Sequence, residues 1–568
     1  MGLTNKMKRV QFLTDRQTDR QTDRQTDRQT DRQTDRQTDR QTDRTHSLSK
    51  LYFNGTRYIR NYSRNVFLPI LVFVLILNYL FIIHGNTTPD GYLEGYAFFR
   101  NADWQLATGR WANRFVNMIT GNVVFPLLSI LISIVANYLV SILLIRLWNI
   151  QNKFNQALVG LSIAIAPALV CQYLYTYSIL AFSLSLFLSS FSVFILFVNS
   201  ISKWKKFIIS IICMSIALVC YQAYIGFSIA VVIITIILKT FNGISLKDSI
   251  RKLVFCIFSV ICGCALYLII LKVNLIIFGV ELSNYGGADN IGIWNSLTKL
   301  PQSCLQAYKS FIDYFTVDAK LYGWLFIIPF ILFGTIFLVR LMIKKGNWEG
   351  NAFVAALVLS LPLSMNCVII VAPDRNLYTV MLHQLQLIIP FVLAIEEQNE
   401  FTNKQIKQIF KKAPKLFATL FCWTCLIAGF CTHYSMVFAS NYHTSTIQTM
   451  LTRSSEIADP AKTRMLIAGA PDESFQKSNK LYKFSYYTNS TAVWSNNEYH
   501  ICEGWRKYLT ENFGYDSGVI SHDEFCDIIN SEKFERMNLY PNEGSIKLFN
   551  DIIVVKLEDL TTEISTMN

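Results

Sequence analysis

A polar segment between the first two hydrophobic stretches, residues 88–111, gathers carboxylates, arginines and tryptophans at one edge of a membrane. A carboxylate can act as a general base on a hydroxyl group. Arginine binds phosphate oxygens bidentately, and tryptophan suits both a membrane interface and the flat face of a sugar ring. Their combination favours a functional loop over an ordinary amphipathic connector. The residues concerned are Asp90, Glu94, Arg100, Asp103, Trp104, Arg110, Trp111 and the closely following Arg114.

Composition places the chain among membrane proteins. It has 568 residues, of which 52% are hydrophobic and 14% aromatic, and its mean hydropathy is +0.31. Apolar runs of about 20 residues recur between positions 66 and 438, and each is long enough to cross a hydrocarbon core of roughly 30 Å. Most of the net charge of +13 lies in short loops beside these runs, so it reports orientation and does not indicate a nucleic-acid partner.

The spacing of the apolar runs predicts a mainly α-helical polytopic protein with about eleven transmembrane helices. One apolar block, residues 206–239, is too long for a single helix, and we divide it at the polar pair Tyr221-Gln222. The predicted spans are residues 66–84, 123–145, 155–174, 178–199, 206–220, 223–238, 253–278, 321–340, 352–371, 377–395 and 415–438.

Basic residues cluster before the first span and in every second loop, which predicts a cytoplasmic N-terminus and an external C-terminus. Residues 90–114, the Tyr221-Gln222 break, residues 281–320 and the Pro373-Asp374-Arg375 segment would then face outward. A polar break within an apolar block is tolerated only where it lines a cavity. We therefore expect these four segments to converge on one site.

Three regions are predicted along the chain. Residues 1–50 form a cytoplasmic head, residues 51–440 form the multi-span domain, and residues 441–568 form a small extracytoplasmic domain of α/β or α+β type. Residues 465–468 and 551–556 read as strands, and residues 503–512 and 523–529 read as helices.

The head repeats Thr-Asp-Arg-Gln between positions 14 and 44. This repeat has no apolar period and nothing to bury, so disorder is predicted. Three successive copies of one tetranucleotide, ACAG, give the codons ACA-GAC-AGA-CAG, which encode the same four residues. Because such tracts slip during replication, the repeat suggests a phase-variation switch of the kind found in genes that alter surface glycans.

The thirteen cysteines show no metal-type spacing, and no carboxylate cluster has the spacing of a metal site, so neither a metal nor another cofactor is expected. Most of the cysteines lie in apolar runs, where a buried thiol is usual. Cys502 and Cys526 lie in polar sequence and are the candidate disulfide pair.

The polar segment resembles the first outer loop of the bacterial O-antigen glucosyltransferase family (Gtr type II). The resemblance is carried by Pro89-Asp90-Gly91, Asp103-Trp104 and Gly109-Arg110-Trp111, and Tyr221-Gln222-Ala223-Tyr224 is similar to a mid-chain element of that family. It extends over about residues 65–560. It implies a GT-C-like membrane fold, a polyprenyl-phosphate glucose donor, and transfer to a cell-surface polysaccharide on the outer face of the bacterial cytoplasmic membrane.

For such a reaction Asp90 is the expected general base. Glu94 lies four residues further on, so in a helix the two carboxylates would face the same way, and Glu94 is expected to position the sugar. Arg110 and Arg114 have the same spacing and are expected to clamp the donor phosphate. Arg375 is a further candidate for the phosphate.

The remaining candidates each have two interpretations. Trp104 and Trp111 form a sugar platform or anchor the loop at the interface. Tyr221 and Gln222 contact the substrates or form a polar pair between packed helices. Asp374 contacts the acceptor or forms a surface ion pair with the arginine that follows it.

The main alternative function is a transporter or flippase of lipid-linked glycans, which would also explain many spans and outward polar breaks. Against it, the spans contain no internal repeat, and no chain of buried charges follows a pathway across them.

Overall fold

The computed structural model of the protein describes residues 62–560, apart from residues 86, 95–98, 100–101, 284–297, 374–376, 402–403, 472–478, 488–497 and 516–517. The chain divides into two units, residues 1–64 and residues 65–568, and every element discussed below belongs to the second. The Thr-Asp-Arg-Gln repeat, with its predicted disorder, lies outside the described residues.

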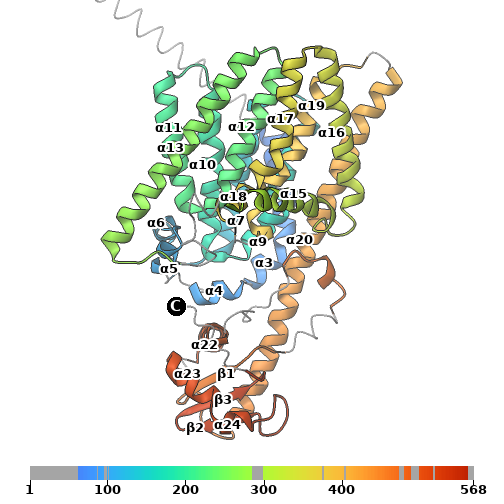
Figure 1. Ribbon diagram of the computed structural model, residues 1–568. Helices are drawn as coiled ribbons and strands as arrows, with labels where there is room; N and C mark the ends of the chain where they lie inside the picture. The colour runs from blue at the N-terminus through green and yellow to red at the C-terminus, as the bar shows by residue number, and fades with distance from the viewer. Residues whose placement is uncertain are drawn as a thin grey trace, which may run out of the picture. The chain divides into compact units, whose positions relative to one another are not determined.

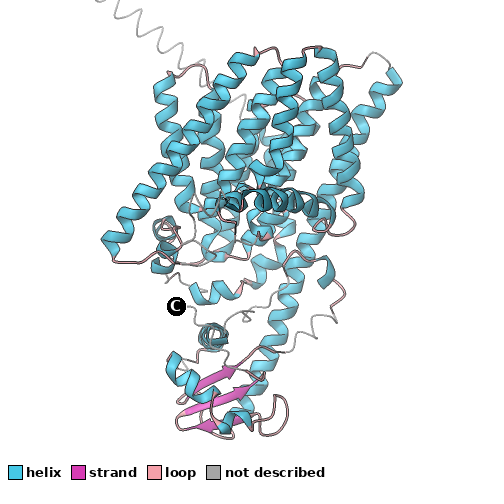
Figure 2. Ribbon diagram, viewed as in Figure 1, coloured by secondary structure: helices cyan, strands magenta, loops and turns pink. Residues whose placement is uncertain are grey.

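The described chain is mainly helical, as predicted (Figures 1 and 2). Helices occupy all eleven segments that the sequence marks as apolar. They are α2 (Leu68–Leu77), α3 (Tyr79–His84), α7 (Pro126–Leu147), α8 (Lys153–Ala164), α9 (Pro167–Tyr173), α10 (Ile179–Phe197), α11 (Lys203–Cys220), α12 (Ile225–Phe241), α13 (Leu246–Phe278), α16 (Trp324–Lys345), α17 (Trp348–Met365), α18 (Cys367–Val371), α19 (Ile388–Gln398) and α20 (Lys404–Ser454).

Within the described residues, seven helices are long and apolar enough to cross a membrane, and eight if α8 and α9, bent by 45°, count as one span. The predicted count of eleven is therefore not confirmed. Asn78 divides the first predicted span into α2 and α3, and α19 has only 11 residues because 3-10 turns replace its first part. These two segments are as apolar as predicted, but the breaks divide them into helices that are too short to cross a membrane.

The predicted break at Tyr221-Gln222 is confirmed. Helix α11 ends at Cys220, Tyr221 is extended, and α12 begins at Ile225 after a 3-10 turn. The hydroxyl of Ser185 donates hydrogen bonds to the carbonyls of Ala217 and Tyr221 at 2.7 and 3.2 Å. The carbonyl of Ala217 still accepts the amide of Tyr221 at 2.9 Å, so the bond from Ser185 to Tyr221 is the one that supplies a partner beyond the end of α11. Such partners are the condition for breaking a helix in apolar surroundings.

The polar segment of the sequence folds into three short helices, α4 (Pro89–Glu94), α5 (Ala102–Ala107) and α6 (Ala112–Met118). The amides of Asn113 and Asn117 fix α6 against the start of α10, because they donate to Ser178 Oγ at 3.1 Å and to the carbonyl of Tyr177 at 3.0 Å. A further amphipathic helix, α15 (Leu300–Thr316), lies between α13 and α16 in the sequence.

Helix α20 is continuous over 51 residues, so the boundary predicted at position 440 falls inside it. The described residues beyond it form a three-stranded sheet of order β1-β3-β2, with β1 (Arg464–Ala468) parallel and β2 (Ile546–Phe549) antiparallel to the central β3 (Ile552–Lys556). The associated helices are α22 (Glu498–Phe513), α23 (His522–Ile529) and α24 (Glu532–Glu535).

This sheet is covered on both faces. Met465 and Ile553 belong to one hydrophobic cluster, whereas their neighbours Leu466 and Val554 belong to another, as expected when successive strand residues point to opposite faces. The two predicted strands and two predicted helices are confirmed. Cys502 and Cys526 are both free thiols, so the candidate disulfide is not formed.

Candidate functional site

Helix α4, which carries Asp90, is held against the turn that follows α9. The amide of Thr88 and the hydroxyl of Thr87 both donate to the carbonyl of Leu174, at 3.1 and 2.9 Å. Gly91 donates to the carbonyl of Thr88 and lies so close to Thr87 that a Cβ atom would collide with the threonine side chain. The Pro89-Asp90-Gly91 motif therefore has a structural reason for its glycine, and Asp90 is set in a fixed position.

Asp90 is partly buried, and a cation and a tyrosine lie within its electrostatic range. Burial raises the pKa of its carboxyl to about 6, and the nearby Arg110 guanidinium acts in the opposite direction. Burial also raises the pKa of Tyr175 well above its ordinary value, and the Asp90 carboxylate is one of several further causes. Asp90 therefore lies within electrostatic range of both residues, in the environment expected of a general base.

Arg110 is positioned by the turn between α5 and α6. Gly109 has a φ of +78°, and its carbonyl accepts a hydrogen bond from Tyr267 Oη at 3.3 Å. Gln222 Nε2 donates to Tyr267 Oη and to the carbonyl of Thr108, both at 3.1 Å. A Cβ atom on Gly109 would lie 2.5 Å from Tyr267 Oη, so the turn requires glycine for both its conformation and its contacts.

The polar break in the membrane helices therefore supports the loop. Both hydrogens of the Gln222 amide are used in holding the Arg110 turn, so a substrate would meet only its carbonyl oxygen. Tyr221 donates to the carbonyl of Val380 at 3.3 Å, and its ring meets Phe182 edge-on at 4.6 Å. These contacts favour a structural role for the pair, and substrate contact stays a prediction.

Three of the four segments that we expected to converge contact one another. The polar segment contacts the Tyr221-Gln222 break, the amide of Ser283 donates to the carbonyl of Ala107 at 3.0 Å, and Tyr221 brings Val380 to the same end. Asp374 and Arg375 lie outside the described residues, as does the side chain of Glu94. Their predicted roles therefore stay predictions.

Arg114 lies apart from Arg110. Helix α6 begins at Ala112, so Arg110 precedes it and the two arginines do not share the face of one helix. The Arg114 guanidinium lies over the ring of Phe278, 4.8 Å from its centroid. The four-residue spacing of the two arginines therefore does not place them on one helix face, as a two-arginine clamp would need. Arg110 is the arginine in electrostatic range of Asp90.

The two tryptophans differ in their surroundings. Trp111 is partly buried, meets Phe115 edge-on at 5.7 Å, and packs against the cluster that contains Leu106 and Tyr267. Its indole nitrogen is buried and has no hydrogen-bond partner in the described part of the chain. Trp104 is 36% exposed, which suits an interfacial anchor or a sugar contact.

Comparison with family models gives one match. The model described as glucosyl transferase GtrII matches residues 96–389, which is just over half of the chain. The chain belongs to the GtrII family of glucosyl transferases. No curated protein and no solved structure matches it.

The GtrII match confirms the resemblance that the sequence motifs carry. It includes Arg110, Trp111, Gln222 and Tyr267, which form the turn and its support. Asp90 lies just before the first matched residue.

Three tyrosines of this GtrII protein were missed by the sequence analysis. Tyr175 lies in electrostatic range of both Asp90 and Tyr487, and Tyr267 supports the Arg110 turn. The run Tyr173-Leu-Tyr-Thr-Tyr177 at the end of a span was a usable signal for the first. Tyr267 lies inside an apolar run and Tyr487 far along the chain, so neither gave a signal.

Residues after position 440 of this GtrII chain also pack against the polar loop. Tyr92, two residues after Asp90, is 2% exposed and belongs to the same hydrophobic cluster as Ile447 and Trp505. Its ring meets Tyr508 of α22 edge-on at 5.2 Å. The hydroxyl groups of Tyr508 and Thr444 are 2.8 Å apart, which ties this contact to α20. The core of the C-terminal region is therefore continuous with α4.

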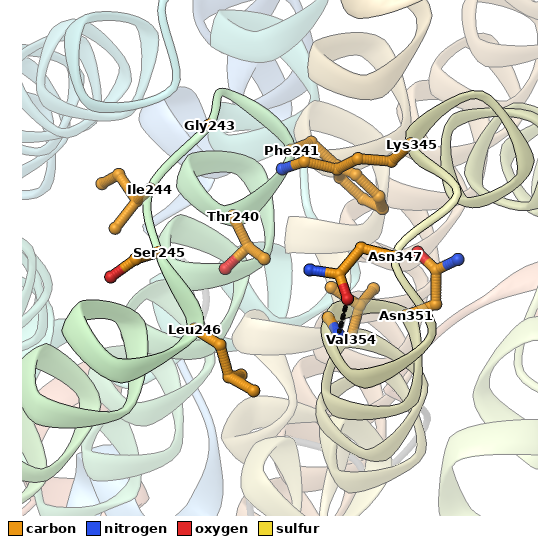
Figure 3. A pocket seen from close by; sticks show the side chains of 11 residues that line it. Thr240, Phe241, Gly243, Ile244, Ser245, Leu246, Lys345, Asn347, Asn351 and Val354 are labelled. Atoms are coloured by element: carbon orange, nitrogen blue, oxygen red, sulfur yellow. Dashed lines mark hydrogen bonds between the residues drawn. The ribbon is translucent and has the colours of Figure 1, made fainter.

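A cavity of about 200 Å³ lies elsewhere, between the α12–α13 and α16–α17 turns (Figure 3). Thr240, Ser245 and Asn347 are among the residues that line it. Because α12 runs from the Tyr221-Gln222 break to this cavity over 17 residues, roughly 25 Å separate the cavity from the loop site. It is therefore distinct from the candidate active site.

Proposed function

We propose that this GtrII protein transfers glucose from a polyprenyl-phosphate donor to a hydroxyl group of a surface polysaccharide, on the outer face of the cytoplasmic membrane. The observation that carries the proposal is the partly buried Asp90 within electrostatic range of Arg110, in a loop at one end of the apolar helices. A base beside a phosphate-binding cation is what this transfer requires.

In the proposed step the acceptor oxygen attacks C1 of the glucose. The bond between C1 and the phosphate oxygen breaks, and its electron pair leaves with the polyprenyl phosphate. The proton of the acceptor hydroxyl passes to Asp90, which the raised pKa keeps ready to accept it. Arg110 stabilises the phosphate anion as it leaves. No separate acid is needed, because a lipid phosphate is a stable leaving anion.

The outer face is supported by the charge pattern. Basic residues lie in the last turn of α7, in the first turn of α11, in the last turn of α12 and in the first turns of α13, whereas α4 to α6 lie at the other ends of these helices. By the positive-inside rule this arrangement supports a location of Asp90 and the C-terminal sheet outside the cytoplasm.

The test is turnover by the purified protein in detergent, with polyprenyl-phosphate glucose and the polysaccharide of the host cell. Release of polyprenyl phosphate together with glucosylated product supports a transferase. A flippase would move the lipid across a vesicle bilayer without breaking its glycosidic bond, and that result would overturn the proposal. Loss of one side-branch hexose from the glycan of cells lacking the gene is the expected cellular counterpart.

The ionisation of Asp90 should appear in the pH dependence of kcat/KM. A general base must be ionised, and the pKa of this carboxyl is raised to about 6. We therefore expect kcat/KM to fall about tenfold for each pH unit below about 6, and to level off above it. A limb near pH 4, the range of an ordinary exposed carboxyl, would contradict the assignment.

Tyr92 should position Asp90 through the C-terminal region. Tyr92→Ala removes a ring that is 2% exposed, a change that typically costs about 3–5 kcal/mol in a well-packed core. We expect faster amide exchange in α4, a lower kcat, and an acidic limb moved to lower pH because Asp90 becomes more hydrated. Tyr92→Phe keeps the ring contact with Tyr508 and should restore most activity. An unchanged limb in Tyr92→Ala would exclude the positioning role.

A further inference from the structure

A lysine cluster surrounds Phe197 at the end of α10 that lies far from the loop site. Lys239 of α12 and Lys252 of α13 place their ammonium groups 5.5 and 4.9 Å from the centroid of this ring. Lys206 of α11 lies within electrostatic range of Lys252. Two cations therefore face one aromatic ring, and a third, from another helix, lies within electrostatic range of one of them. We call the three lysines and the ring the Phe197 cluster.

The cluster is built into the helical bundle. Lys206 and Phe197 are each only 8% exposed, and Lys239 and Lys252 are half-buried. The hydroxyl groups of Thr240 and Ser249 are 3.0 Å apart, which fixes the ends of α12 and α13 to each other. The lysines therefore belong to packed helix ends and not to a free loop.

The cluster has excess positive charge. None of its three lysines forms an ion pair with a carboxylate in the described part of the chain. Asp248, one turn before Lys252, instead pairs with Arg251 at 3.4 Å and accepts a hydrogen bond from Ser245. Of the titratable groups that act on Lys252, Lys239 and Lys206 are cations and Cys256 is a thiol. Like charges at partly buried positions repel each other, so a bound anion would stabilise this end of the bundle.

The surroundings fit the headgroup of a lipid. Helices α10, α12 and α13 are each long and apolar enough to cross a membrane, so we expect their ends where a helix leaves the hydrocarbon. Basic pockets between membrane helices are typical binding sites for phosphate headgroups. The 19 residues of α10 place Phe197 roughly 28 Å from the start of the helix, where Ser178 accepts a hydrogen bond from Asn113 of α6. A donor phosphate held by Arg110 cannot also reach this cluster.

We propose that the Phe197 cluster binds the phosphate of an anionic phospholipid, with the ammonium groups of the half-buried Lys239 and Lys252 around the phosphate and their stems against the start of the acyl chains. This site is separate from the glucosyl transfer site. It does not depend on the identity of the sugar donor.

The test measures lipid retention by the purified full-length protein. Native mass spectrometry after exchange into mixed phosphatidylglycerol and phosphatidylcholine should show selective retention of phosphatidylglycerol. The double variant Lys239→Gln/Lys252→Gln should lose about 30-fold in apparent affinity, since each lysine near anionic lipid contributes a factor of about five. The matched control is Lys203→Gln/Lys205→Gln, which removes the same charge from exposed positions at the start of α11. It should retain the lipid within about twofold, because exposed charges are screened.

Two further experiments distinguish a lipid phosphate from free inorganic phosphate and test whether the variants fold. Lys239→Arg/Lys252→Arg keeps both charges and should keep selective retention of phosphatidylglycerol. That result would show that the glutamine double variant loses the lipid because it loses charge and not because it misfolds. Displacement of phosphatidylglycerol by millimolar inorganic phosphate would show a free-anion site and overturn the lipid assignment. Equal losses in the two glutamine double variants, or equal retention of both lipids by the unmodified protein, would overturn the site itself.

Discussion

Asp90→Asn is expected to lower the rate of glucosyl transfer by about 10²–10⁴ while the protein stays folded and binds its donor. The substitution keeps the size of the side chain and removes the proton acceptor. Arg110 and the turn that holds it are untouched, because Gln222 and Tyr267 make their hydrogen bonds to the backbone of that turn. The loss should therefore appear in kcat and leave KM for the donor nearly unchanged.

Stability should not fall in this variant. The pKa of Asp90 is higher in the folded protein than its ordinary value of 3.8, so the folded state binds the proton more tightly than the unfolded state. The stability that protonation provides is complete below pH 3.8 and is lost as the pH rises through about 6. At neutral pH the ionised carboxylate is thus destabilising, and a neutral carboxamide avoids that cost.

Asp103→Asn is the matched control, since it makes the same chemical change in the same loop. Asp103 is exposed at the start of α5, and within the described part of the chain it forms no hydrogen bond or ion pair with Arg110. It should retain most activity at equal membrane levels. Normal transfer by the Asp90→Asn protein would remove Asp90 from the mechanism, and equal losses in both variants would make the loop structural.

Apolar composition predicted where the helices lie because burial in lipid acts on every residue of a span. It did not predict their length, since a single polar residue such as Asn78, or the turns before α19, ends a helix without altering mean hydropathy. The break at Tyr221-Gln222 was predictable because two polar groups within an apolar block need partners. Those partners, Ser185, Thr108 and Tyr267, come from distant parts of the sequence and could not be read from the local sequence.

The site was predictable by residue type and less so by arrangement. Asp90 and Arg110 were found because charge at a membrane edge is conspicuous. The spacing of Arg110 and Arg114 suggested a shared helix face, but the positive φ of Gly109 ends that regularity before α6 begins. The polar composition after position 440 suggested a new domain, whereas helix α20 continues to Ser454. Composition indicates whether a segment faces water or lipid, and it does not indicate where a helix ends. The burial of Tyr92 depends on that continuity.

Arg110→Ala is expected to weaken donor binding by about 10–100-fold, the loss typical of one charge-assisted hydrogen-bonded contact. The effect should appear as a higher KM for the polyprenyl-phosphate sugar. Arg110→Lys should recover only part of it, since a point charge lacks the bidentate fork of the guanidinium. Titrating the lipid donor against both variants, with the acceptor saturating, measures this difference.

The same variant should also move the pH profile. Arg110 lowers the pKa of Asp90 against the larger effect of burial, so its removal should shift the acidic limb above pH 6, and lysine should return it. Arg114→Ala provides the comparison, because that guanidinium lies over Phe278 and should affect neither donor KM nor the limb. If Arg114→Ala raises the donor KM while Arg110→Ala does not, the phosphate lies on the α6 side of the loop. A shifted limb with an unchanged donor KM in Arg110→Ala would restrict Arg110 to setting the charge of Asp90.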